Sequence, residues 1–234
     1  MAINRSRLDR FMSNQCDLNK KEVRLIVAQR RILVDGVVAS SVAQQVDSFS
    51  HIVFDGEVVQ SNQAIYIMLN KPVGVVCATK DDKHKTVLEL LDKQYQTVHI
   101  VGRLDLNTSG LVLLTNDSRW SERLTQPERK VAKNYHVTLQ NPLSNDYVKA
   151  FLEGMYFGYE DITTLPAELK ILTSNTARVS LIEGKYHQIK RMFGRFRNPV
   201  VGLHRESIGQ LKLDRSLNPG ESRLLTPVEV STIA

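Results

Sequence analysis

The apolar residues near the start of the chain recur with the period of an α-helix. This spacing predicts two short amphipathic helices, with inward faces at Leu8, Phe11 and Met12 on the first and at Val23, Ile26 and Val27 on the second. Asn19 followed by Glu22 has the pattern of a capping box, in which each side chain bonds the backbone N–H of the other residue. The second helix is therefore expected to begin just after Asn19.

The pattern then changes to β-branched runs around Asp-Gly pairs. Residues 32–38 and 53–58 each place such a pair between two apolar runs. Both turn positions of this hairpin type need a positive φ, which favours Asp and Gly there. Polar residues follow at 60–63. We predict a compact unit of helices and hairpins over residues 1–60, a linker at 61–64 and a second domain over residues 65–234.

The second domain is predicted to mix strands and helices without regular alternation. Apolar and β-branched runs predict strands at 65–69, 111–115, 135–139 and 178–182, and helical spacing predicts helices at 147–152 and 188–197. A doubly wound parallel sheet needs a crossover helix between successive strands, and the pattern does not supply one each time. We therefore predict an α+β fold with a mixed sheet.

Composition narrows the class of protein. The chain has 234 residues, 42% of them hydrophobic and 24% charged, which is typical of a globular protein. Its longer apolar runs, such as 65–69, fall far short of the roughly 18 residues of a membrane span. The first residues lack the apolar stretch of a secretory signal, so we expect a cytoplasmic protein with no membrane partner. Cys16 and Cys77 are expected to be reduced thiols, and the six histidines show no metal-ligand spacing.

Positive charge is concentrated at the start of the chain. The net charge is +6, and residues 1–34 hold eight basic against three acidic residues. Lys20, Arg24 and Arg31 follow at intervals of four and seven, which predicts one outward stripe on the second helix. With the neighbouring Lys21, this stripe is a candidate contact for the phosphates of a nucleic acid, although a merely solvated surface has the same composition.

Two segments of the chain resemble known families. The run Arg7-Leu8-Asp9-Arg10-Phe11, the basic second helix and residues 31–36 resemble the RNA-binding module named after ribosomal protein S-four. Residues 102–117 read Gly-Arg-Leu-Asp-Leu-Asn-Thr-Ser-Gly-Leu-Val-Leu-Leu-Thr-Asn-Asp and resemble the signature of the RsuA-type pseudouridine synthases. Further segments that fit this family are 68–74, 133–139, 183–193, 203–209 and 219–226.

The resemblance implies an isomerase that needs neither cofactor nor metal. It makes Asp105 the catalytic carboxylate and nucleophile, and it leaves open whether Asp105 attacks the sugar, attacks the base or removes a ribose proton. It also implies that Tyr135 packs on the target base and that residues 183–193 supply a basic partner for Asp105. By analogy Arg103 is a candidate wedge that fills the space left by the extruded base; an ion pair within its loop is the alternative.

Helical geometry selects the basic partner. Ile189, Met192, Phe193 and Phe196 define a buried stripe, which places Lys190 at its edge and Arg191 roughly opposite. We therefore assign Lys190 to Asp105, and Arg191 to solvent or an RNA phosphate. His136 and His187 are expected to pack or form hydrogen bonds rather than to act as acid or base. Trp120 and Phe157 are expected to be core or surface anchors.

The expected substrate follows from the layout of the chain. An N-terminal module without a long basic C-terminal tail is most similar to the family members that modify small-subunit (16S) ribosomal RNA. We expect a monomer that acts on 16S rRNA within a small-subunit assembly intermediate. The alternatives are a pseudouridine synthase for large-subunit rRNA and a non-catalytic RNA-binding factor for ribosome assembly.

Overall fold

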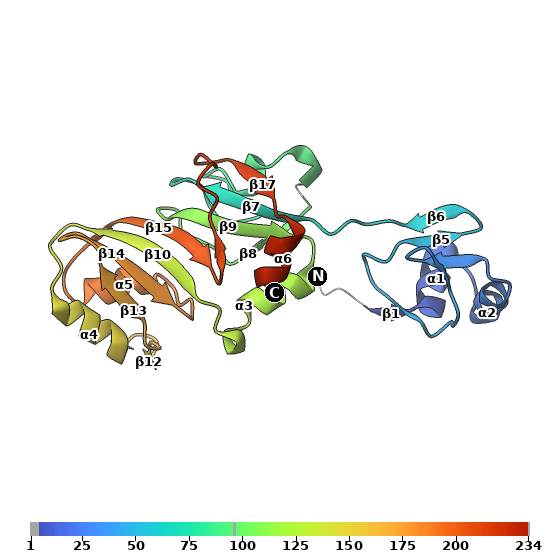
Figure 1. Ribbon diagram of the computed structural model, residues 1–234, viewed down its shortest axis with the longest axis horizontal. Helices are drawn as coiled ribbons and strands as arrows, with labels where there is room; N and C mark the ends of the chain where they lie inside the picture. Colours follow the sequence, from blue (N-terminus) through green and yellow to red (C-terminus); the bar gives the residue numbers. More distant parts are fainter. Residues whose placement is uncertain (1–4, 96, 234) are drawn as a thin grey trace. The chain divides into compact units, whose positions relative to one another are not determined.

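The computed structural model describes residues 5–95 and 97–233, and it divides the chain into two compact units (Figure 1). The first unit comprises the N-terminal residues up to Ala64 together with Asp117–Arg119. The second comprises Ile65–Asn116 and the chain from Trp120 onward. Each unit has a hydrophobic core of its own.

The first unit packs two helices against short strands. Its elements are β1 (Ser6–Arg7), α1 (Leu8–Cys16), α2 (Lys20–Ala28), β2 (Ile32–Val34), β3 (Val37–Val38), β4 (Gln45–Val46), β5 (Ile52–Phe54) and β6 (Glu57–Gln60). Strands pair in the order β3-β2-β5-β6, and β1 pairs with β4. The predicted inward faces of both helices are confirmed, because Leu8, Met12, Val23, Ile26 and Val27 are buried in one core and the partly buried Phe11 packs against it.

The predicted local signals of this unit are also confirmed. The Asn19 side chain accepts hydrogen bonds from the backbone of Lys21 and Glu22 at 3.0 Å, and the Glu22 carboxylate accepts one from the Asn19 backbone at 2.7 Å. Both Asp-Gly pairs form hairpin turns in the left-handed region, with φ of 52° and 78° in the first and 53° and 86° in the second. These turns set the register of the two hairpins.

One prediction for this unit is wrong. Arg31 does not extend the stripe of Lys20 and Arg24, because α2 ends at Ala28 and Arg30 reverses the chain with a φ of 60°. The Arg31 side chain instead forms an ion pair with Asp55, to which its Nε donates at 2.7 Å. Its guanidinium also lies 5.3 Å from the ring centre of Phe54. The hairpin of β5 and β6 supplies these partners from outside the helix.

A nine-stranded sheet forms the frame of the second unit. Its strands are β7 (Tyr66–Lys71), β8 (His99–Val101), β9 (Ser109–Thr115), β10 (Lys133–Leu139), β13 (Glu168–Ile171), β14 (Thr176–Leu181), β15 (Val200–Ile208), β16 (Leu211–Lys212) and β17 (Ser222–Leu224). The main path runs β13-β14-β10-β15-β9-β7-β17, with β16 beside β15 and β8 beside β9. All pairs are antiparallel except β15 with β9. The predicted strands and the mixed sheet are confirmed.

Helices and short segments complete the second unit. They are α3 (Ser118–Thr125), whose first two residues belong to the first unit, α4 (Asn145–Glu153), α5 (Gln188–Gly194), α6 (Pro227–Ile233), the pair β11 (Tyr156–Phe157) and β12 (Ile162–Thr163), and the 3₁₀ turns Leu88–Leu90, Lys93–Tyr95 and Pro127–Arg129. Helix α5 ends three residues earlier than predicted, and Arg197 beyond it has a φ of 52°. Within residues 5–95 and 97–233, no helix is long and apolar enough to cross a membrane.

The sheet separates two layers of apolar side chains, because successive residues of a strand point to opposite faces. On one face, Val112 and Val137 pack with Phe151 of α4 and Phe193 of α5, whose rings lie 4.8 Å apart. On the other face, Leu111 and Leu113 pack with Trp120 of α3 and residues of α6. Trp120 is fully buried and Phe157 is 4% exposed, so both are core residues as expected.

Candidate active site

Asp105 lies in the loop that joins β8 to β9. Its carboxylate Oδ2 is 3.5 Å from Nζ of Lys190 and 3.4 Å from Nε2 of His187. The side chain is 34% exposed, so the carboxylate is open to a ligand while Lys190 and His187 contact it. The structure thus brings Lys190 to Asp105, as the helical geometry of residues 188–197 predicts.

The start of α5 carries His187 and Lys190, the two residues that contact the Asp105 carboxylate. Ile189, Met192 and Phe193 are buried in the core and fix the rotation of the helix. Lys190 then lies at the edge of the buried stripe, with its side chain 28% exposed. His187 is the residue just before the helix, and it has a φ of 49°. His187 was expected only to pack or form hydrogen bonds; the sequence offers no signal that its ring reaches the carboxylate.

Arg191 is partly exposed, with 26% of its side chain accessible, and its guanidinium is paired rather than free. Its Nη1 donates to Glu160 at 2.7 Å, and its guanidinium lies 3.8 Å from the ring centre of Phe157. Both partners belong to the segment from β11 to β12, which packs over the side of α5 that the helical wheel leaves open. A contact with RNA would compete with this ion pair.

Tyr135 and Asp105 line one small cavity of about 110 Å³. Tyr135 is on β10, where the pairing with β15 shifts register between Asn134 and Tyr135, and it is 8% exposed. Thr108 lines the same cavity, and its buried hydroxyl has no hydrogen-bond partner within the part of the chain that the structure describes. The cavity therefore offers a carboxylate and an aromatic wall.

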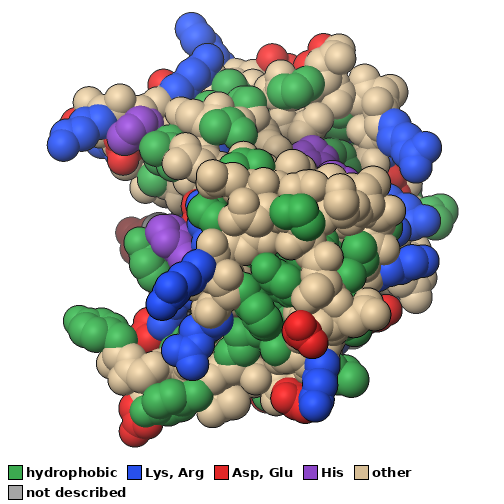
Figure 2. Space-filling model, turned by 90° about the vertical axis from the view of Figure 1, so that its left-hand side faces the viewer, with side chains coloured by type: hydrophobic (Ala, Val, Ile, Leu, Met, Phe, Trp, Pro, Cys, Tyr) green, Lys and Arg blue, Asp and Glu red, His purple; other side chains and the backbone are tan. Residues whose placement is uncertain are grey.

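Arg103 stands at the rim of this cavity. Its side chain is exposed, and no carboxylate among residues 5–95 and 97–233 forms an ion pair with it. The alternative role, an ion pair within the loop, is therefore not observed. Figure 2 views the end of the second unit that carries α4 and β13, and Lys, Arg and His side chains border a hollow at the edge of that face.

Two buried cations donate hydrogen bonds to the backbone of the loop that carries Asp105. Neither has a role predicted from the sequence. Lys71 is fully buried, and its ammonium donates to the backbone oxygens of Thr108 at 2.6 Å and of Asp105 at 3.1 Å. Burial lowers the pKa of Lys71. Arg205 is 1% exposed and donates to the backbone oxygens of Leu111 at 2.7 Å and Gly102 at 2.8 Å. Both residues fall inside segments that resemble the family, 68–74 and 203–209. This resemblance is the feature of the sequence that could have indicated their importance.

The backbone also approaches closely beside Asp105. Gly110 pairs with Arg205 in the one parallel contact of the sheet and has a φ of 107°. A Cβ atom at position 110 would overlap the backbone of Arg205. Only glycine suits this position, so the loop end is held against β15 at a distance that other residues do not allow.

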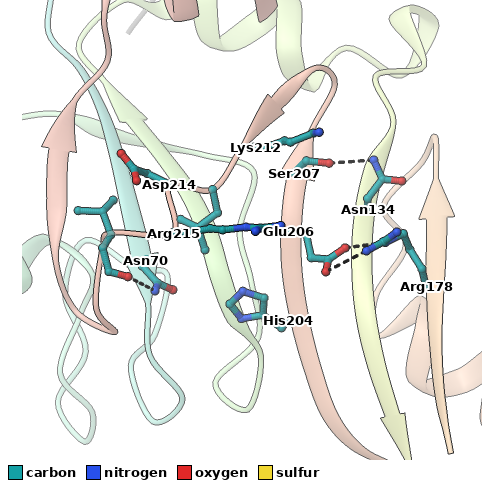
Figure 3. Close-up of a pocket in the computed structure, with 11 residues that line it drawn as sticks. Asn70, Asn134, Arg178, His204, Glu206, Ser207, Lys212, Asp214 and Arg215 are labelled. Atoms are coloured by element: carbon teal, nitrogen blue, oxygen red, sulfur yellow. Dashed lines mark hydrogen bonds and ion pairs between the residues drawn. The ribbon is translucent and has the colours of Figure 1, made fainter. Parts of the chain in front are cut away.

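A larger cavity of about 590 Å³ lies on the opposite face of the sheet (Figure 3). Asn70 and His204 point into it, and Arg178 pairs with Glu206 at 2.7 Å along its wall. Burial lowers the pKa of His204, whose Nδ1 lies 2.9 Å from the Ser109 hydroxyl. Asp105, Tyr135 and Lys190 do not line this cavity, so the smaller cavity is the candidate active site.

The basic residues of the first unit remain on its surface. Lys20, Lys21 and Arg24 are exposed on α2. Arg24 and Arg30 line a shallow surface cavity with residues 38–42. Apart from Arg31, which is paired with Asp55, these side chains are positioned to meet an anion in solvent.

The fold and this site together define an enzyme class, and comparisons with known proteins agree with it. The family described as RNA pseudouridylate synthase matches residues 65–194. A solved structure described as a pseudouridylate synthase superposes with a TM-score of 0.72 at 38% identity, covering 98% of this chain and 99% of that one. The chain belongs to the RNA pseudouridylate synthase family, and it is an isomerase, as its signature predicts.

Two relatives show how far the similarity extends. The ribosomal small subunit pseudouridine synthase A of Pseudomonas aeruginosa is 44% identical over 229 residues, which cover 97% of this chain and 100% of that protein. The protein of the same name from Escherichia coli K12 is 40% identical over 229 residues, covering 97% and 99%. The similarity therefore includes both units of the fold.

Proposed function

We propose that this protein converts a specific uridine of small-subunit (16S) ribosomal RNA into pseudouridine, with Asp105 as the reacting carboxylate. The observation that carries the proposal is the position of Asp105, which lines a cavity together with Tyr135, while Lys190 Nζ and His187 Nε2 lie 3.5 Å and 3.4 Å from its carboxylate. The names of the relatives support the small-subunit substrate.

The reaction needs a negative charge beside the ribose and the base. The bond between the anomeric carbon and N1 of uracil breaks, the base turns, and a new bond forms from the same carbon to C5. The proton on C5 leaves and N1 gains one, so the product is an isomer and no oxidant or cofactor takes part. Asp105 serves as nucleophile toward the sugar or the base, or as the base that removes a ribose proton. Each route requires its ionised form.

The surrounding side chains suit this chemistry. An ammonium group 3.5 Å from the carboxylate stabilises the negative charge of Asp105. The ring of Tyr135 provides a flat wall against which a uracil ring can stack. The exposed Arg103 can enter the space that the uridine leaves when it is extruded from the RNA, which costs a few kcal/mol of lost stacking.

The first unit is proposed to hold the RNA rather than to react. Lys20, Lys21 and Arg24 are exposed on α2, where they can neutralise phosphates without reading sequence. Arg31 adds to this surface only if RNA displaces Asp55. The substrate we propose is rRNA in an assembling small-subunit particle in the cytoplasm, bound by a monomer.

Asp105→Asn tests the assignment, because the amide keeps the shape and removes the charge. Pseudouridine formation expels the hydrogen on C5, so rRNA transcribed with 5-tritiated uridine releases tritium into water. We expect the variant to lose more than about 10³-fold in rate, with RNA affinity retained. Asp82→Asn, at an exposed loop position, is the matched control with full activity.

The same assay separates the other functions. Tritium release from large-subunit rRNA alone would move the substrate to that RNA. Binding without any release by the wild-type protein would indicate a non-catalytic assembly factor. Substantial release by Asp105→Asn would remove Asp105 from the reaction.

A further inference from the structure

Tyr186 is an exposed aromatic residue with an unusual position. Its side chain lies on the ring of His187, with ring centres 3.9 Å apart and ring planes 19° from parallel. Tyr186 is nevertheless 72% exposed, so the ring face that does not contact His187 is open to solvent. Large aromatic side chains normally bury such a surface. Tyr186 therefore contributes little to the core, and it differs from the more exposed Tyr159 in being stacked on a ring beside Asp105.

The Tyr186–His187 stack is in direct contact with the candidate active site. His187 Nε2 lies 3.4 Å from the Asp105 carboxylate, and His187 lines the same cavity as Tyr135. A continuous set of contacts thus runs from Asp105 through His187 to the open face of Tyr186. A planar group on that face would be separated from Asp105 by the two stacked rings of His187 and Tyr186.

Several hydrogen bonds hold the turn that carries the stack. Gln188 accepts a hydrogen bond from the Lys185 backbone at 3.0 Å and donates to Glu183 at 2.6 Å. Arg191 reaches the Tyr186 carbonyl oxygen at 3.4 Å while it is paired with Glu160. This network supports the left-handed backbone of His187, and a turn held by such bonds loses less freedom when a ligand binds than a turn without them.

We propose that Tyr186 is a stacking platform for an unpaired RNA base next to the target uridine. The proposal rests on the function proposed above. Extruding a uridine removes a stacking partner from its neighbour, and unstacked RNA bases are commonly received by aromatic side chains. The Tyr186 ring is stacked on His187, and His187 lines the cavity that holds Asp105. The chemical class of the ligand is a single-stranded nucleobase, taken without preference for its hydrogen-bonding edge.

Substitutions that separate aromaticity from volume test the platform. Tyr186→Phe keeps the ring, Tyr186→Leu keeps apolar volume without it, and Tyr186→Ala removes both. We expect Leu and Ala to raise the half-saturating rRNA concentration in the tritium assay by about 5- to 150-fold, as loss of one stacked base predicts. Phe should stay near wild type, and the rate at saturation should change little in all three.

Tyr159→Ala is the matched control, because Tyr159 is 98% exposed and forms no ring contact with the residues that the structure describes. Its half-saturating rRNA concentration should equal that of the wild type. If Phe and Leu have the same affinity for rRNA, or if the variants lose only the rate at saturation, Tyr186 is not a stacking platform. The second pattern would instead indicate that Tyr186 positions His187.

A fluorescent trinucleotide tests the subsite without turnover. The probe has uridine between two 2-aminopurine nucleotides, and stacking quenches 2-aminopurine fluorescence. Wild type and Tyr186→Phe should quench the bound probe, and Tyr186→Leu should not. Equal quenching by Phe and Leu contradicts the platform. Absence of tritium release from any rRNA by the wild type contradicts the proposed function, and the quenching result is then interpreted independently.

Discussion

At the scale of single residues, the second unit uses its charges in two ways. Lys190 is partly exposed and directed at the Asp105 carboxylate, whereas Lys71 and Arg205 are buried and directed at backbone oxygens of the same loop. A buried cation without a carboxylate partner is costly unless its donors are satisfied. The carbonyl groups of the loop accept hydrogen bonds from both cations, and the same bonds fix the position of the loop backbone. Asp105 is thus positioned through its backbone and stabilised through its side chain.

The contrast between Lys190 and Arg191 gives a prediction at this scale. We expect Lys190→Met to slow single-turnover tritium release by about 10²-fold or more, because the Asp105 charge loses its ammonium partner. Arg191→Met should leave rRNA affinity unchanged and lower the melting temperature, because Glu160 and Phe157 lose their partner. Lys149→Met, at an exposed position of α4, is the control. A loss of affinity in Arg191→Met with an unchanged melting temperature would show that Arg191 binds RNA after all.

At the scale of elements, one arginine ties three segments together at the C-terminal end of the sheet. Arg223 on β17 donates to Asp214, in the loop after β16, at 2.7 Å and to Glu229 in α6 at 2.7 Å and 2.8 Å. The bidentate pair with Arg223 lowers the pKa of Glu229 to about 2. Hydrogen bonds from Ser216 and then Arg223 lower the pKa of Asp214 to about 2.

These pKa shifts predict how acid affects the network. A carboxyl group whose pKa is depressed by folding stabilises the protein above its unfolded pKa, near 4, and loses this contribution as the pH falls toward 2. Arg223→Met should therefore melt below the wild type at pH 7, and the difference should shrink steadily between about pH 5 and pH 2. Melting followed by circular dichroism measures it, with the exposed Arg215→Met as control. A difference that does not depend on pH would mean that Arg223 acts through packing alone.

At the scale of the whole molecule, two units with separate cores divide the work that we propose. Asp105, Tyr135 and Lys190 belong to the second unit, and Lys20 and Arg24 belong to the first. Affinity that depends on phosphate contacts can therefore change without altering the reacting groups. The division also explains why a small unit rich in basic residues needs no cavity for the target base.

The salt dependence of binding tests this division. Changing Lys20 and Arg24 together to Gln should weaken rRNA binding and reduce the slope of log affinity against log salt by about 1.4–1.8, if each side chain neutralises one phosphate. Tritium release from bound RNA should not change. Arg31→Gln is the control, since Asp55 already neutralises Arg31 and the slope should stay as in the wild type. An unchanged slope in the double variant would leave Lys20 and Arg24 as solvated surface charges.

Local rules account for the parts of the fold that could be predicted. The capping box at Asn19, the two Asp-Gly turns and the strands of the sheet depend on backbone geometry and on neighbours within a few residues. The rotation of α5 was predictable for the same reason, because its apolar stripe must face the core, and this placed Lys190 toward Asp105. The isomerase class came from a long run of matched residues around Asp105, which marks a whole loop rather than one side chain.

Tertiary structure alone decided which distant side chains meet. Arg31 pairs with Asp55 across 24 residues, and Arg191 with Glu160 across 31, and neither partner follows from helical spacing. His187 reaches Asp105 only because the chain takes a left-handed turn before α5, and Lys71 and Arg205 lie beneath the loop because β7 and β15 flank β9. The sequence by itself determined the local elements and singled out Asp105 as the candidate carboxylate. The partners of its charges were set by packing, because an ion pair depends on distances in space that a pattern along the chain does not contain.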